Sequence, residues 1–222
     1  MKIALLTTNQ RFKSEIETVN LFFDYGLDYL HLKKRRFSRS KTKKYIKEIN
    51  EAHRRKIFLH KYHWLAVWYK LKGIHLGRSD RQKPIRTKLK IFFMKLFHPK
   101  LEVSVSFHSL QSATQDKGQY HHAMLSPVFD SISKKNYSPA FSERQLVGLM
   151  EKTNHRYFAL GGVDETHIQT AKDVGFEGVV VYGSIWNSGD EKLKTFKKIF
   201  DKVKSRQKDI PEVKINPVKI KI

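Results

Sequence analysis

The sequence predicts an α/β protein folded as a single (β/α)8 barrel, the TIM-barrel architecture. Short apolar runs alternate with longer stretches of helical periodicity, which is typical of a parallel sheet with right-handed crossovers. Eight such pairs fit into about 200 of the 222 residues, and eight parallel strands close into a barrel. The segment 7–10 after the first strand is Thr-Thr-Asn-Gln. Its lack of glycine disfavours the rival fold, an open doubly wound sheet with a glycine-rich first turn.

The expected strands are short, and their apolar residues are continuous or alternate at period two. The first, at the start of the chain, is interpreted as a buried strand and not as a secretion signal, because no small-residue cleavage site follows it. The eight expected strands cover residues 2–8, 27–33, 56–60, 73–77, 102–106, 122–126, 157–160 and 178–182.

The expected helices repeat apolar residues three or four positions apart. In the first of them, Ile16, Val19 and Phe23 share a face and Gly26 ends the helix. Residues 78–100 are less regular, and we expect a polar loop followed by a helix over the aromatic stretch 91–97 that covers the barrel. The expected helices span residues 14–25, 40–53, 64–71, 91–97, 109–116, 142–153, 165–174 and 189–206.

Two segments differ in their expected organisation. Residues 1–206 form the barrel, and residues 207–222 form a basic tail in which two prolines exclude a helix. Valine and isoleucine alternate with lysine in this tail, so an added edge strand and a disordered arm are both open. Loose packing or disorder is favoured because chain termini are usually poorly tied down.

Composition narrows the class of protein. The absence of cysteine excludes disulfides, thiolate zinc sites and cysteine nucleophiles, and it agrees with the cytoplasmic location that we expect. No apolar run approaches the length of a membrane span, so no membrane partner is expected. The formal net charge of +23 has two explanations, a nucleic-acid partner or lysine-rich solvated helices around a pocket for an anionic substrate. The lysines are spread over the whole chain, which favours the second.

The carboxyl ends of the predicted strands carry cations, hydroxyl groups and glycines. In barrels of this kind the active site lies at this end. Lysine and arginine supply charge, serines supply neutral hydrogen bonds, and glycines let backbone N–H groups approach a phosphate closely. The pattern therefore predicts a site for a phosphorylated small molecule. One carboxylate, Asp80, could hold Mg²⁺ beside a pyrophosphate.

Several segments at these positions resemble the thiamine phosphate synthase and thiazole tautomerase superfamily over about residues 2–200. They are LDYLHLKKR (27–35), GIHLGRSD (73–80), VSVSFHSLQSA (103–113), MLSPVFDSISKK (124–135) and ALGGVDETHIQTAKDVGFEGVVVYGSIW (159–186). The synthases join hydroxymethylpyrimidine pyrophosphate to a thiazole phosphate. The resemblance implies that pyrophosphate leaves first and that the thiazole nitrogen captures the resulting pyrimidine-methyl cation. Such a reaction needs stabilisation of the leaving group more than it needs a base.

The resemblance also implies roles for particular residues. Catalytic roles at the leaving pyrophosphate are implied for Lys33, Arg35, Ser106 and Lys134. Binding of substrate or phosphate is implied for His31, His60, Lys61, Ser131, Ser133, Gly162, Tyr182 and Gly183. Mg²⁺ is the implied cofactor, with Asp80 as its ligand. The implied partners are the two small phosphorylated substrates, and a homodimer is compatible with the sequence.

Two positions depart from the superfamily pattern. His60-Lys61 stands where the synthases have an Asn-Asp pair that supplies a second Mg²⁺ ligand, and His31 replaces a glutamine. Lysine cannot bind Mg²⁺, so we hypothesise that Lys61 replaces part of the charge of the metal. Pro127 stands where the tautomerases have a proton-shuttling histidine, which favours the synthase branch. The alternatives are a tautomerase-like or catalytically degenerate barrel that binds phosphate ligands, and a basic nucleic-acid-binding protein.

Overall fold

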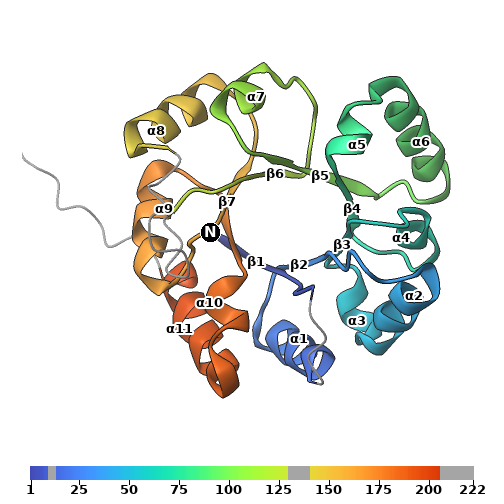
Figure 1. Cartoon of the computed structure of the whole chain (residues 1–222), viewed down its shortest axis with the longest axis horizontal. Coiled ribbons are helices and arrows are strands. Elements are labelled where there is room, and N and C mark those ends of the chain that lie inside the picture. The colour runs from blue at the N-terminus through green and yellow to red at the C-terminus, as the bar shows by residue number, and fades with distance from the viewer. Residues whose placement is uncertain (10–13, 130–140, 206–222) are drawn as a thin grey trace, which may run out of the picture.

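The computed structural model describes residues 1–9, 14–129 and 141–205. Eight parallel strands form a closed barrel in sequence order, and β8 pairs with β1 so that Val181 lies opposite Leu5 (Figure 1). The strands are β1 (Lys2–Leu6), β2 (Tyr29–Leu32), β3 (Ile57–Leu59), β4 (Gly73–Leu76), β5 (Glu102–Phe107), β6 (His122–Leu125), β7 (Tyr157–Leu160) and β8 (Gly178–Val181). The predicted (β/α)8 barrel is thus confirmed.

Helices surround the barrel (Figure 1). The α-helices are α1 (Glu15–Tyr25), α2 (Arg39–Glu48), α3 (Glu51–Arg54), α4 (Trp64–Trp68), α5 (Arg78–Arg81), α6 (Pro84–Phe97), α7 (Leu110–Gln115), α8 (Glu143–Lys152), α9 (Ile168–Val174), α10 (Gly183–Trp186) and α11 (Lys192–Lys204). Two short 3₁₀ turns, Glu165–His167 and Gly189–Glu191, precede α9 and α11. Among the described residues, every helix is too short or too polar to span a lipid bilayer.

The segment between β4 and β5 differs from its predicted structure. The expected polar loop contains the short helix α5, and α6 begins at Pro84, seven residues before the aromatic stretch. Proline suits the first turn of a helix because its missing N–H has no intrahelical partner there. Met94 is fully buried, but many other apolar side chains of α6 face solvent. They are Ile85, Leu89, Phe92, Phe93, Leu96 and Phe97.

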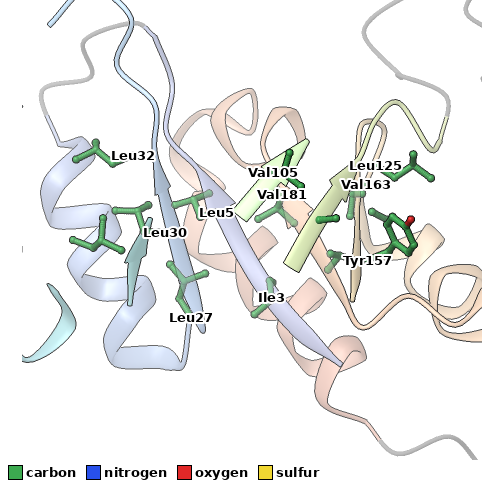
Figure 2. Close-up of a cluster of buried hydrophobic side chains, with 14 of the residues drawn as sticks. Ile3, Leu5, Leu27, Leu30, Leu32, Val105, Leu125, Tyr157, Val163 and Val181 are labelled. Carbon is green, nitrogen blue, oxygen red and sulfur yellow. The ribbon is translucent and has the colours of Figure 1, made fainter. Parts of the chain in front are cut away.

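The main hydrophobic core lies between the barrel wall and the helices. Leu5, Leu30 and Val181 point outward from their strands into this layer, as Figure 2 shows for one part of it. On α1, Val19, Phe22 and Phe23 are buried against it, which follows from their spacing along one helix face. This layer fixes the strands and so positions the loops at their carboxyl ends.

The barrel interior has two chemically different sides. One is apolar, where Ala4, Leu6, Met124, Phe158 and Val180 pack together. Gly178 gives Phe158 its space, because a Cβ at this glycine would lie 2.5 Å from the Phe158 ring. The other side is polar, because inward positions of β2, β4, β5 and β6 carry histidine or serine. These residues are His31, His75, Ser104, Ser106 and His122.

Candidate active site

The structure places most of the expected site residues at one end of the barrel. Because all eight strands are parallel, the residues that follow them share the carboxyl end. Lys33 and Arg35 follow β2, Lys61 follows β3, and Asp80 lies in α5 after β4. Gly162 follows β7, and Tyr182 and Gly183 follow β8. Ser131, Ser133 and Lys134 lie outside the described residues, as does the tail 207–222.

The basic residues Lys33, Lys34 and Arg35, which follow β2, lie in different environments. Lys33 is half-buried, and its backbone N–H donates to Thr7 Oγ1 at 2.9 Å. Burial, and then the charge of Arg35, lower the pKa of Lys33, so its ammonium gains from an anion nearby. Arg35 is exposed. Lys34 points into the protein, where it forms a buried ion pair with Glu15, so it serves the packing of α1.

Asp80 is held by groups that the sequence did not reveal. Its Oδ1 accepts from Lys90 Nζ of α6 at 2.7 Å, and its Oδ2 accepts from the Gly77 N–H at 3.1 Å. Burial raises the pKa of Asp80, but the Lys90 hydrogen bond and nearby positive charges outweigh it and leave the pKa lowered. Lys90 Nζ also lies 3.0 Å from His63 Nδ1.

This arrangement does not fit a Mg²⁺ ion at Asp80. An ammonium group stands where the cation would approach Oδ1, and Asp80 belongs to no described group of three histidine or carboxylate side chains that could share a metal. Lys61 is an exposed cation whose Nζ lies 3.5 Å from the Arg35 carbonyl oxygen. At this part of the site, the described residues supply lysine charge in place of metal ligands.

A pocket of about 330 Å³ lies after β7 and β8. Its lining includes Gly162, Asp164, Gly183 and Ser184. Gly162 has φ +67°, a left-handed conformation that favours glycine. The Ser184 hydroxyl is buried and has no hydrogen-bond partner among the described residues. An unpartnered hydroxyl beside glycine turns is suited to binding phosphate oxygens.

A chain of histidines runs through the polar side of the barrel interior. His31 Nδ1 lies 3.1 Å from His60 Nε2, and His31 Nε2 lies 3.0 Å from His122 Nε2. The chain continues from His122 Nδ1 to His121 Nδ1 at 2.9 Å, and from His121 Nε2 to the Tyr29 hydroxyl at 3.4 Å. Each neutral imidazole has one N–H, so the tautomers along this chain depend on one another.

His75 lies beside this chain, and two serines bind its ring. Its ring stacks on that of His60 with centroids 4.0 Å apart. His75 Nδ1 lies 3.0 Å from Ser104 Oγ, and His75 Nε2 lies 3.1 Å from Ser106 Oγ. Ser104 Oγ also donates to the Ile74 carbonyl oxygen at 3.3 Å. Ser106, which is expected to bind pyrophosphate, therefore also forms a hydrogen bond with the buried His75 ring.

Burial keeps the interior histidines neutral. Desolvation, with the neighbouring positive groups next, lowers the pKa of His75 to about 3 and that of His121 to about 4. The pKa values of His31, His60 and His122 lie well below the ordinary value for the same reasons. At neutral pH the polar side of the barrel therefore offers nitrogen lone pairs and N–H groups but no charge.

Three groups near the site were missed by sequence reasoning. Lys90 lies on a helix that was not predicted to begin before residue 91, and Ser184 lies within the resembling segment 159–186 but was given no role there. His122 was assigned to a strand but not to its inner face. His122 lies opposite Ser104 of the neighbouring strand, and this pairing places it on the inner face. The pairing depends on the register between the two strands, which the sequence of one strand does not contain.

Comparison with known proteins agrees with the motifs. The family model described as thiamine monophosphate synthase matches residues 3–185. A thiamine-phosphate synthase of one Prochlorococcus marinus strain is 32% identical over 134 residues, covering 60% of this chain and 36% of that protein. The enzyme of a second strain is 29% identical and covers 58% and 34%. The chain thus spans about a third of the length of these curated relatives.

Solved structures show the same likeness over nearly the whole chain. The crystal structure of thiamine phosphate pyrophosphorylase from Bacteroides thetaiotaomicron aligns with a TM-score of 0.71 and 26% identity, covering 91% of this chain and 97% of that one. Thiamine phosphate pyrophosphorylase from Pyrococcus furiosus aligns with a TM-score of 0.72 at 18% identity, covering 91% and 95%, and shows the shared fold.

Proposed function

Because the chain belongs to the thiamine monophosphate synthase family, we propose that it condenses hydroxymethylpyrimidine pyrophosphate with thiazole phosphate to give thiamine phosphate and pyrophosphate. The observation that carries this proposal is the pairing of two anion-binding regions at one end of the barrel. One contains Lys33, Arg35 and Ser106, and the other is the pocket lined by Gly162 and Gly183. A pyrophosphate and a monophosphate require two such regions.

The proposed reaction is a substitution at the methylene carbon of the pyrimidine. The carbon–oxygen bond breaks, and its electron pair leaves with pyrophosphate. The thiazole nitrogen then donates its lone pair to the same carbon, so no proton has to be removed for the new bond. Lys33, Arg35, Ser106 and Lys134 stabilise the charge that develops on the leaving group. This stabilisation lowers the barrier because it is strongest when the bond is breaking.

The second substrate occupies the other region in this proposal. Gly162 and Gly183 approach the thiazole phosphate through their backbone, and the Ser184 hydroxyl donates a hydrogen bond to it. Ser131 and Ser133 contact the same phosphate. We assign contact with the organic parts of the substrates to His60 and Tyr182. His31 is fully buried with both ring nitrogens bound to other histidines, so its role is to orient His60. Lys61 adds charge near the pyrophosphate.

A Mg²⁺ requirement stays a prediction of the family resemblance, but Asp80, the ligand that the resemblance implies, does not fit the ion while it is bound to Lys90. The Lys90 contact has to open before Asp80 can serve. Assays after treatment with a chelator, with and without added Mg²⁺, test the requirement. We also propose that the protein acts on these two substrates in the cytoplasm and forms a homodimer.

Lys33 gives a direct test of the proposed site. Lys33→Met removes the charge but fills the same half-buried space, and it should lower kcat by about 100-fold, the usual cost of losing one preorganised charge-stabilising group. Lys100→Ala is the control, because this exposed lysine precedes β5 at the opposite end of the barrel. Thiamine phosphate formation is measured by chromatography. Equal rates for Lys33→Met and the wild type would remove Lys33 from the mechanism.

A further inference from the structure

His31, His60 and His75 form the one described group of three histidine or carboxylate side chains that could hold a metal ion. His31 lies in β2, His60 directly follows β3, and His75 lies in β4. One ring nitrogen of each lies within 4.8 Å of the other two. We propose that these three imidazoles bind a divalent transition-metal ion of the Zn²⁺ class at the carboxyl end of the barrel. The site is separate from the expected Mg²⁺ ligand Asp80.

The spacing between the first two nitrogens is close to that of a metal site. Two ligand nitrogens about 2.0–2.1 Å from a tetrahedral Zn²⁺ lie about 3.3 Å from each other. His31 Nδ1 and His60 Nε2 are 3.1 Å apart. Binding of both nitrogens to one ion therefore requires an opening of a few tenths of an ångström, and the proton between them has to move to the other nitrogen of its ring.

The third ligand is prepared by its serine partners. Ser104 Oγ donates its proton to the Ile74 carbonyl oxygen, so it accepts from His75 Nδ1–H. This fixes the tautomer of His75 and leaves the lone pair of Nε2 available, with Ser106 Oγ donating to it in the metal-free protein. The rings of His60 and His75 are nearly parallel, at 16°, so His75 has to tilt out of the stack for the two lone pairs to converge.

The remaining contacts supply an outer-shell partner for His31. A metal-binding histidine usually donates its second ring N–H to a neighbouring acceptor. With a metal on Nδ1, His31 donates from Nε2 to His122, 3.0 Å away. His122 then donates to His121, and His121 donates to the Tyr29 hydroxyl. Metal binding thus fixes which residue donates in each of these hydrogen bonds, because every donation then runs from His31 toward Tyr29.

The ligand set indicates both the metal and its chemistry. Imidazole nitrogens suit Zn²⁺, Cu²⁺, Ni²⁺ and Fe²⁺, whereas Mg²⁺ takes oxygen ligands. Three neutral ligands leave the ion with both of its positive charges and leave the fourth tetrahedral position to water or to an oxygen of an anionic ligand. Ser106, proposed to contact pyrophosphate, lies beside the third ligand, with its Oγ 3.1 Å from His75 Nε2 in the metal-free protein. The site therefore places a divalent cation next to the region that we propose for pyrophosphate.

Metal binding is tested on the full chain without substrates, so its outcome is independent of the proposed activity. After chelator treatment and dialysis, Zn²⁺ is titrated by calorimetry, and Co²⁺ is titrated while visible absorption is recorded. The expected result is one ion per chain, the visible bands of four-coordinate Co²⁺, a higher Tm with Zn²⁺ and no such rise with Mg²⁺. Loss of outer-shell partners already lowers metal affinity about 10- to 100-fold. His60→Asn or His75→Gln should therefore weaken binding by more than about 100-fold.

His108→Gln is the matched control, because His108 is exposed and follows β5 at the same end of the barrel. It should bind Zn²⁺ as the wild type does. His60 is only half-buried, so His60→Asn is the variant better able to fold, and circular dichroism without metal checks this. Zn²⁺ affinity equal in His60→Asn and the wild type would overturn the proposal. If His60→Asn does not fold, a wild-type Co²⁺ complex without four-coordinate bands would overturn it.

Discussion

At the scale of single residues, the site differs from its sequence-based description mainly in how its polar groups are paired. Asp80 is bound to Lys90, Ser106 to His75, and His31 to two other histidines. Each of these partners lies between 10 and 91 positions away along the chain. Sequence motifs identified at least one member of each pair, and both members of the pair His31 and His60, because a motif reports the chemical type of single residues. The pairing depends on strand register and helix position, which no local pattern contains.

Lys61 stands where the synthases have a second Mg²⁺ ligand, and its proposed role can be tested by mutation. If its ammonium supplies charge near the pyrophosphate, Lys61→Ala should lower kcat by about tenfold or more while the fold is kept, because the side chain is exposed. Lys100→Ala is again the control for loss of one exposed positive charge. Turnover of Lys61→Ala equal to that of the control, measured by the same chromatography of thiamine phosphate, would refute the hypothesis.

The interior histidines predict how stability depends on pH. An unfolded histidine takes up a proton near pH 6.5, whereas burial keeps these folded histidines neutral to much lower pH. The unfolded state therefore binds more protons below pH 6.5, and stability that is fully present above this pH is lost as the pH falls toward about 4. Each fully neutral histidine contributes up to about 1.4 kcal/mol per pH unit. The contributing residues are His31, His60, His75, His121 and His122.

Urea unfolding at pH 7.5, 6.0 and 5.0, in the presence of a chelator, measures this effect. The midpoint should fall in both intervals, and further between pH 6.0 and 5.0 than between 7.5 and 6.0. A constant midpoint over this range would mean that the histidines are protonated in the folded state.

At the scale of elements, the strands were predictable and the short helices were not. All eight strands lie within or next to the predicted ranges, because each is a buried apolar run between turn residues. The four-residue helices α3, α5 and α10 are too short for a periodic pattern to develop. The beginning of α6 was also missed, because its first two turns are basic and expose their apolar residues.

Helix α6 gives a prediction about assembly. Its apolar side chains reach 83% exposure at Ile85 and 73% at Phe97, which is unusual for a monomeric surface. We expect a second copy of the chain to cover this face in the proposed homodimer. The double variant Leu89→Glu with Phe92→Glu should then be monomeric by light scattering, whereas Lys88→Gln, on the same helix, should keep the wild-type mass. A monomeric wild type, or a dimeric double variant, would contradict this prediction.

At the scale of the whole molecule, the closed barrel explains why residues far apart in sequence form one site. Parallel strands place the loop after β2 at the same end as the pocket after β7 and β8, and closure through β1 and β8 brings the two next to each other. The barrel interior contributes a second feature, because its polar side reaches toward this end through His31 and His60. The number of strands was predictable from alternation alone. The division of the interior into apolar and histidine-rich sides was not, because it requires the inward residues of several strands to be compared in register.

The activity assay tests the central claim most directly. Purified protein is incubated with hydroxymethylpyrimidine pyrophosphate and thiazole phosphate, with and without Mg²⁺, and thiamine phosphate is measured together with released pyrophosphate. The account predicts equal amounts of both products under at least one of the two conditions. Binding of both substrates without formation of thiamine phosphate under either condition would contradict it and would identify the chain as a barrel that binds these ligands without catalysis.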